Sequence, residues 1–165
     1  AGIVFYHQLM RDNMRKHLEV RRAQITNEPA VRQCAEEAYE QYVAAIGKQP
    51  APMVADFASL IASEHVYVAV DVDDDLLGFI VFFQKGDYMF LENVAVCQNA
   101  TGTGIGKRLI AFCEATAKEA NLGSVHLYTN EKMTGNLSLY PHLGYQETDR
   151  RTEDGFNRIF FEKTI

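Results

Sequence analysis

A glycine-rich segment at residues 101–109 constrains the fold more than any other part of the chain. It reads Thr-Gly-Thr-Gly-Ile-Gly-Lys-Arg-Leu and joins a strand-like run to an amphipathic helical pattern. Glycines let the backbone approach a ligand closely, and the first turn of a helix presents unpaired N–H groups that carry partial positive charge. The segment therefore predicts a phosphate-binding turn between a strand and a helix.

The spacing of these glycines differs from two common phosphate-binding loops. A dinucleotide-binding fold requires Gly-x-Gly-x-x-Gly, and a P-loop requires four residues between its first Gly and Gly-Lys-Ser/Thr. Neither pattern fits Gly102, Gly104 and Gly106. A nucleotide-binding module is therefore the weakest of the functions considered below.

Composition indicates one globular domain and limits its partners. The 165 residues are 47% hydrophobic and 11% aromatic, enough for a single buried core. A net charge of -6 argues against nucleic acid or an anionic membrane as a partner. The longest apolar runs have strand length, and residues 2–10 lack a signal-peptide pattern, so we expect a cytoplasmic protein, monomeric or homodimeric.

The cysteines and acidic residues indicate no metal site. Cys34, Cys97 and Cys113 have no metal-ligand spacing, and their odd number argues against a disulfide framework. We expect Cys34 and Cys113 to be buried in helix core faces, whereas Cys97 borders the glycine segment. The run at residues 73–75, Asp-Asp-Asp, is interpreted as a solvated hairpin turn because it lacks the other ligands of an EF-hand loop.

Periodicity and turn residues predict one α+β domain at residues 18–165 after an N-terminal extension at 1–17. Strands joined by tight turns must be antiparallel neighbours, whereas a strand reached through a helix is parallel to its predecessor. The predicted order is a strand at 18–23, helices at 28–46 and 54–63, strands at 66–71, 76–84 and 88–96, a helix at 105–120, a strand at 125–128, a helix at 135–143, and strands at 144–150 and 156–162.

This order, the glycine segment and the Tyr-x-x-x-Gly-Tyr block at residues 140–145 resemble the GCN5-related N-acetyltransferases (GNAT) over about residues 18–163. The family pattern Gln/Arg-x-x-Gly-x-Gly/Ala falls on Thr101, Gly104 and Gly106, with Thr in place of Gln or Arg. The resemblance implies a mixed, mostly antiparallel seven-stranded sheet that is splayed between its fourth and fifth strands and flanked by about four helices.

The resemblance also implies acetyl-CoA as co-substrate, without a metal. The Val94 N–H would polarise the thioester carbonyl, and Val96 would pair with the pantetheine amide. Met133 stands where the family often has Asn, so Asn130 and Asn136 are rival candidates for coenzyme hydrogen bonds, with turn or capping roles as the alternative. The residues expected at the pyrophosphate are Thr101, Gly102, Thr103, Gly104, Ile105, Gly106 and Lys107.

Two residues are candidates for proton transfer. Tyr140 matches the tyrosine that the family places near the coenzyme sulfur, where a phenol can protonate the leaving thiolate; alternatively, it is a core aromatic. Glu92 and Asn93 are adjacent polar residues in an apolar strand, so one faces a buried layer or the strand is bulged. We expect Glu92 to share a face with Val94 and to act as general base, with a solvated carboxylate as the alternative.

The predicted function is N-acetyl transfer by direct attack of a primary amine on acetyl-CoA. The chief alternative is a catalytically inactive acyl-CoA-binding sensor, because Thr101 and Met133 depart from the family pattern. The acceptor site is expected between residues 39–53 and 150–156. Their mixed charge suits a small-molecule amine or a peptide N-terminus and does not choose between them.

Overall fold

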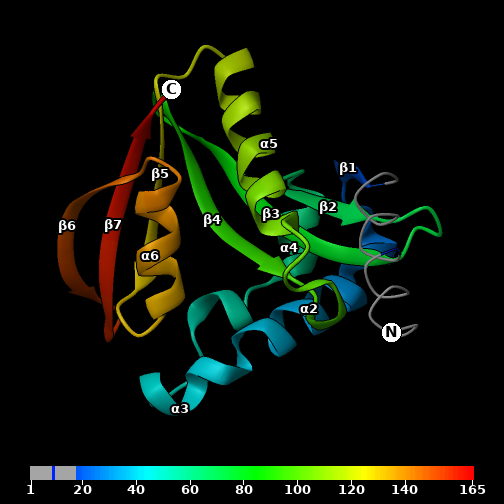
Figure 1. Ribbon diagram of the computed structural model, residues 1–165, viewed down its shortest axis with the longest axis horizontal. Coiled ribbons are helices and arrows are strands. Elements are labelled where there is room, and N and C mark those ends of the chain that lie inside the picture. The colour runs from blue at the N-terminus through cyan, green and yellow to red at the C-terminus, as the bar shows by residue number, and fades with distance from the viewer. Residues whose placement is uncertain (1–8, 10–17) are drawn as a thin grey trace.

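The computed structural model describes Leu9 and residues 18–165. The predicted extension at 1–17 lies, apart from Leu9, outside the described residues. The remaining chain forms one sheet with helices on both faces (Figure 1). Among the described helices, none is both long and apolar enough to span a lipid bilayer.

The sheet has seven strands in the order β1-β2-β3-β4-β5-β7-β6. Every neighbouring pair is antiparallel except β4 and β5, which are parallel as the crossover helix predicted. The expected mixed, mostly antiparallel sheet is confirmed. The strands are β1 (Glu19–Arg22), β2 (Val66–Val70), β3 (Leu76–Lys85), β4 (Tyr88–Val96), β5 (Ser124–Asn130), β6 (Gln146–Glu153) and β7 (Phe156–Thr164).

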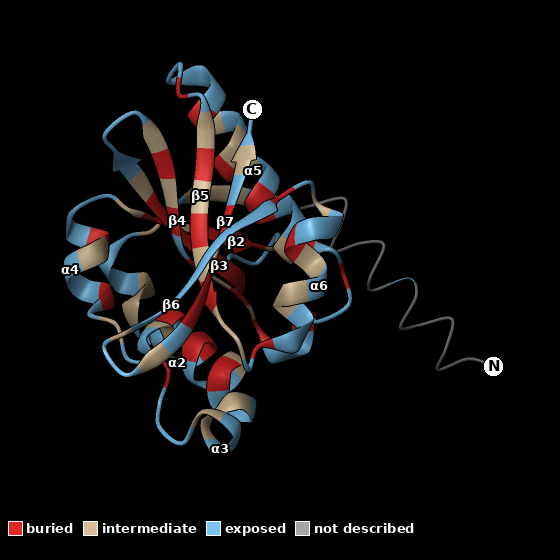
Figure 2. Ribbon diagram, turned by 90° about the vertical axis from the view of Figure 1, so that its left-hand side faces the viewer, coloured by how far each residue is buried: buried red, intermediate tan, exposed pale blue. Residues whose placement is uncertain are grey.

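Two hydrophobic cores lie on opposite faces of the sheet. Helices α5 (Ile105–Glu119) and α6 (Thr134–His142) pack over one face and bury their own Leu109 and Tyr140 against it. Helices α2 (Glu28–Tyr39) and α4 (Phe57–Ala62) cover the other face over the β1–β4 half, where Val31 and Phe57 are buried. Figure 2 shows that the strands at the centre carry most of the buried positions, whereas β6 at the sheet edge is exposed along nearly all its length.

The first predicted helix, 28–46, is interrupted. A 3-10 turn, η2 (Glu40–Tyr42), separates α2 from the short α3 (Val43–Ile46), and Gly47 ends α3 with a φ of 86°. The second predicted helix is shorter than 54–63, because Asp56 caps α4 by accepting a hydrogen bond from the Ser59 N–H. These breaks let the chain turn across one end of the sheet, where η3 (Ala51–Met53) lies.

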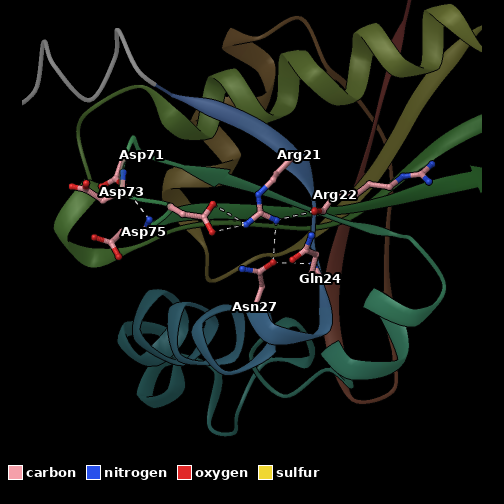
Figure 3. Close-up of polar contacts among 8 residues, drawn as sticks. Arg21, Arg22, Gln24, Asn27, Asp71, Asp73 and Asp75 are labelled. Carbon is pink, nitrogen blue, oxygen red and sulfur yellow. Dashed lines mark hydrogen bonds and ion pairs between the residues drawn. The ribbon is translucent and has the colours of Figure 1, made fainter.

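Arg21, in the edge strand β1, connects this strand to the turn before β3 and to the start of α2 (Figure 3). Its guanidinium pairs with Asp74 at 3.0 Å and donates to the Asn27 side chain at 3.1 Å. Asp71 shapes the turn before β3, because its Oδ1 accepts hydrogen bonds from the N–H groups of Asp73 and Asp75. The acidic run at 73–75 is exposed, as expected of a solvated turn.

Candidate active site

Strands β4 and β5 separate shortly after they begin to pair. Their parallel register contains only Met89 with Val125 and Phe90 with His126. Beyond these pairs, β5 continues to pair with β7, and β4 continues to pair with β3. The predicted splay between the fourth and fifth strands is therefore confirmed, and it leaves an opening between residues 91–96 and residues 127–130.

A β-bulge lies at the start of this opening. Phe82 pairs with Leu91 and Val81 pairs with Asn93, so Glu92 is an extra residue in β4. The bulge explains how two adjacent polar residues fit in an apolar strand. Asn93 is only 4% exposed, whereas Glu92 is exposed.

Beyond the bulge, alternate residues of β4 turn their backbone groups toward the opening. The Cys97 N–H donates to the Leu77 carbonyl on β3 at 2.8 Å, and Ala95 has the same orientation as Cys97. The Val94 carbonyl faces away from β3, because it accepts a hydrogen bond from the Tyr39 hydroxyl at 2.9 Å. By this alternation, the N–H groups of Val94 and Val96 point into the opening.

The same bulge corrects one sequence-based expectation. Leu91 and Val94 both pack against the core beneath α5, although they are three residues apart, while Ala95 packs against the opposite core. The alternation of side chains between the two faces of the sheet therefore shifts at Glu92. The Glu92 side chain lies on the same face of β4 as Phe90, and Val94 lies on the other face. The expectation that Glu92 and Val94 share a face is wrong, because one inserted residue reverses the order of faces.

A cavity of about 110 Å³ occupies the opening. Its walls come from β4, β5, helix α6 with its N-cap Met133, and the segment 50–55, together with Tyr39 and two residues of β7. The sequence-predicted residues that line it are Glu92, Val94, Asn130, Asn136 and Tyr140. The structure therefore brings both proposed proton-transfer residues and the β4 backbone to one space.

The electrostatic settings of Glu92 and Tyr140 differ. Desolvation raises the pKa of Glu92 above its ordinary value, and Coulombic interactions with His65 and Lys85 oppose this effect. Tyr140 is 4% exposed, and burial raises the pKa of its phenol. Tyr140 therefore retains its proton at neutral pH, as a proton donor must.

The glycine segment forms a backbone nest at the start of α5. Gly102 and Gly104 have φ angles of 77° and 81°, in the left-handed region where a Cβ is unfavourable. The Thr101 hydroxyl donates to the Gln98 carbonyl at 2.8 Å, and the Thr103 hydroxyl donates to the Ala100 carbonyl. These bonds fix the turn from inside, and the chain then enters α5 at Ile105 with Gly104 as its N-cap. Such an arrangement can hold a polyphosphate.

Close packing places this helix start beside β4. A Cβ at Gly106 would lie 3.4 Å from Val96 Cγ2, and a Cβ at Gly78 would lie 2.7 Å from the Ala95 carbonyl oxygen and 3.2 Å from Ile105 Cγ2. Gly78 thus lets α5 approach the sheet near the end of β4. Ile105 is buried and Lys107 is exposed, so the nest lies at the protein surface near the opening.

The two candidate asparagines have different partners. The Asn130 Oδ1 accepts a hydrogen bond from the Lys132 N–H at 2.9 Å, which is a turn role. The Asn136 amide donates to the Thr129 hydroxyl at 3.1 Å and contacts the Met133 sulfur at 3.6 Å. Met133, at the position where the family resemblance led us to expect Asn, is 3% exposed and lines the cavity.

The two segments predicted to form the acceptor site meet each other. The Lys48 ammonium donates to the Asp154 carbonyl at 3.3 Å and lies 4.0 Å from the centre of the Phe156 ring. Phe156 lines the cavity, as do Pro50, Ala51 and Pro52. The connection 47–53 and the β6–β7 hairpin therefore close one side of the cavity together.

Arg158 is a site residue that the sequence-based reasoning missed. Its guanidinium lies 4.3 Å from the centre of the Tyr128 ring and pairs with Glu153 at 3.1 Å and Asp154 at 3.5 Å. Its position in β7, on the opposite face from the buried Ile159, is the sequence signal that could have identified it. Glu153 and Asp154 offset the positive charge of Arg158. The carboxyl group of Glu92 is therefore the acidic group of the cavity lining that Arg158 does not pair with.

The hydrogen bond between Tyr39 and Asn93 was also missed. The Tyr39 hydroxyl lies 2.7 Å from Asn93 Oδ1, and the Asn93 amide donates to the Pro52 carbonyl at 3.0 Å. This chain of bonds connects α2, the bulge and the segment 50–55 around the cavity. Tyr39 was expected only as the first residue of the acceptor segment 39–53, and periodicity carries no information about the partner of its hydroxyl.

Comparison with known proteins places this site in a family. The pattern of the Acetyltransferase (GNAT) family matches residues 27–145, which is most of the chain. No curated protein sequence matches the chain significantly.

Solved structures share the fold at low sequence identity. The PaiA N-acetyltransferase from Thermoplasma acidophilum, solved in complex with coenzyme A, has a TM-score of 0.72 and 18% identity over 90% of this chain and 99% of its own. The ribosomal-protein-S18-alanine N-acetyltransferase from Escherichia coli has a TM-score of 0.69 and 18% identity, covering 90% of this chain and 94% of its own. A putative streptothricin acetyltransferase from Bacillus anthracis, solved with acetyl coenzyme A, has a TM-score of 0.55 and 23% identity, covering 61% of each chain. The predicted GNAT fold is confirmed.

Proposed function

The chain belongs to the GNAT family of acetyltransferases, and we propose that it transfers an acetyl group from acetyl-CoA to a primary amine by direct attack within a ternary complex. The observation that carries the proposal is the opening between β4 and β5. It brings Val94, Tyr140 and Glu92 to one cavity, and Val96 on the same strand lies beside the glycine nest at the start of α5.

The coenzyme is proposed to bind from the nest to the opening. The backbone amides of residues 102–107 would hold the pyrophosphate, with Thr101 and Thr103 shaping the turn. Val96 would pair with the pantetheine arm, and Asn136 and Asn130 would lie beside it. Solved structures of this fold that contain coenzyme A or acetyl coenzyme A support this assignment.

The chemistry requires a polarised carbonyl, a neutral amine and a proton for the departing sulfur. The Val94 N–H would stabilise negative charge on the carbonyl oxygen as the amine attacks. Glu92 would accept the amine proton, directly or through one water, because it reaches the cavity from the opposite face of β4. Tyr140 would donate its proton to the thiolate.

The charges of the cavity support an amine as acceptor. Arg158 is paired with Glu153 and Asp154, so the carboxylate of Glu92 can attract a protonated amine into the aromatic space formed by Tyr128 and Phe156. The acceptor is proposed to be a small amine or a peptide N-terminus. Two structural relatives support this chemistry, the PaiA N-acetyltransferase and the ribosomal-protein-S18-alanine N-acetyltransferase.

The test is release of CoA from acetyl-CoA in the presence of alkyl amines, amino acids and short peptides, with the product identified by mass spectrometry. Each amine is paired with the alcohol of the same skeleton. Acetylation of amines but not of alcohols supports N-acetyl transfer, and intersecting double-reciprocal plots support the ternary complex. Parallel plots would instead indicate a covalent enzyme intermediate.

An acyl-CoA sensor remains the alternative function. The family pattern has Gln or Arg at position 101 and often Asn at position 133. Here the Thr101 hydroxyl is hydrogen-bonded within its own turn, and the Met133 sulfur accepts from Thr129, so neither side chain offers the coenzyme the donor that the family pattern would. Tight binding of acetyl-CoA without CoA release for any acceptor in the panel would favour the sensor over the enzyme.

A further inference from the structure

Two buried cysteines from distant parts of the chain meet next to the glycine segment. Cys34 lies in α2 and Cys97 directly follows β4; they are 2% and 8% exposed. Their Sγ atoms are 3.0 Å apart. A disulfide bond requires about 2.05 Å between the sulfurs, so closure needs an approach of about 1 Å.

The environment of the pair favours reaction at Cys97. The hydrogen bond between the two sulfurs lowers the pKa of the Cys97 thiol, whereas the same bond and burial raise the pKa of Cys34. The thiolate is the reactive form of cysteine, and Cys97 is also the more exposed of the two. Cys113, the third cysteine, lies in the other core and is fully buried.

Cys97 is connected by short-range bonds to the glycine nest. Its carbonyl accepts a hydrogen bond from the Ala100 N–H at 2.9 Å, and the Ala100 carbonyl accepts one from the Thr103 hydroxyl. Gly104, the next residue, is the N-cap of α5. Movement of Cys97 toward α2 would therefore be transmitted along residues 97–104.

We propose that Cys34 and Cys97 form a reversible intramolecular disulfide when the protein meets a peroxide, and that this bond constrains the glycine segment. The Cys97 thiol releases its proton, and the resulting thiolate attacks one peroxide oxygen; the O–O bond breaks, Cys97 becomes a sulfenic acid, and the departing hydroxide takes up the released proton to form water. Cys34 sulfur then attacks Cys97 sulfur, the S–O bond breaks, and the departing hydroxide takes the Cys34 proton to form a second water. Two thiols are oxidised, and one hydrogen peroxide is reduced to two waters.

Peptide mapping tests the bond directly. Trypsin separates the three cysteines into peptides 33–48, 86–107 and 109–118. After treatment of the full chain with hydrogen peroxide and alkylation of remaining thiols, we expect a cross-link between peptides 33–48 and 86–107 that dithiothreitol reverses. Cys113→Ala should give the same cross-link, and Cys34→Ala should give none. A cross-link to peptide 109–118, or oxidation of Cys97 to sulfinic acid without any cross-link, would overturn the proposal.

Hydrogen exchange tests the effect on the loop without a ligand. Amide exchange at residues 98–104 should slow several-fold in the oxidised protein and return on reduction, while the β6–β7 hairpin should not change. Equal exchange at 98–104 in both states would disprove the constraint. A several-fold change in acetyl-CoA affinity on oxidation is also expected; that expectation alone rests on the proposed function, and the cross-link and exchange do not.

Discussion

The hydroxyl oxygen of Tyr39 lies 2.9 Å from the carbonyl oxygen of Val94 and 2.7 Å from Asn93 Oδ1. Helix α2 thereby holds β4 at the point where it leaves β5. A hydroxyl has one hydrogen, so the two acceptors share it. The position of the Val94 N–H in the opening depends on this contact, since the N–H and carbonyl of one residue point toward the same edge.

Tyr39→Phe is expected to lower the free energy of unfolding by about 1–3 kcal/mol, because two buried acceptors lose their donor. Turnover should also fall if Val94 must keep its orientation. Urea denaturation measures the first effect and CoA release the second. Tyr42→Phe is the matched control, because Tyr42 lies on the same segment outside the cavity wall. Equal stability of the two variants would show that the Tyr39 hydroxyl does not hold β4.

Gly104→Ala tests the nest at the start of α5. Gly104 has a φ of 81° with open space around its Cβ position, so the cost is backbone strain of about 1–2 kcal/mol rather than a clash. If the loop relaxes to relieve it, acetyl-CoA affinity should fall about tenfold. Calorimetry with Gly123→Ala as control checks this, because Gly123 has open space and no positive φ. Unchanged affinity in Gly104→Ala would remove the nest from the coenzyme site.

Most of the fold was predictable from sequence, because strand alternation, tight turns and the crossover helix act over short distances. The adjacent polar residues Glu92 and Asn93 predicted either a bulge or a polar residue facing a buried layer, and the sequence did not decide between them. The effect of the bulge on which face Glu92 occupies required the register with β3. Arg158 was not predicted as a site residue, because its contact with the Tyr128 ring spans thirty residues. Tyr39 was predicted only as the first residue of the acceptor segment, because the partner of its hydroxyl, Asn93, lies 54 residues away. The spacing of apolar residues predicts whether a side chain is buried, but it does not predict which group its polar atoms contact.

Tyr140→Phe removes the phenol proton and keeps the ring. We expect kcat to fall by about 10²-fold with acetyl-CoA affinity unchanged, because the ring still packs 5.9 Å from the Phe161 ring. Steady-state kinetics and calorimetry separate the two effects.

Tyr145→Phe provides the control for this variant. The Tyr145 ring lies 5.7 Å from the Tyr140 ring, and among the described side chains its hydroxyl is a buried group without a hydrogen-bond partner. Its removal should leave turnover intact and leave stability unchanged or slightly higher. If both variants keep normal turnover with a good acceptor, Tyr140 is a core residue and not the proton donor.

Glu92→Gln tests the proposed base through pH dependence. An alkylammonium acceptor has a pKa near 10, so most of it reaches the site protonated at neutral pH and must lose a proton before attack. The pKa of Glu92 is raised by desolvation, so the carboxylate is lost as pH falls through that raised value, and kcat/KM should fall with it. In Glu92→Gln this acidic limb should disappear, and the rate at neutral pH should drop by about 10²-fold.

The pH dependence of stability tests the raised pKa of Glu92 independently of activity. Between the ordinary pKa of a glutamate and the raised value in the folded state, the native protein binds more protons at Glu92 than the unfolded chain does. Its contribution to stability is therefore complete below the ordinary pKa and is lost as pH rises through the raised one. Glu92→Gln should remove this loss, so the variant should gain stability relative to wild type on going from acidic to neutral pH, as measured by urea denaturation at several pH values. A variant that gains this stability yet keeps the wild-type acidic limb would show that Glu92 is desolvated in the cavity wall but that another group, or water, takes the proton.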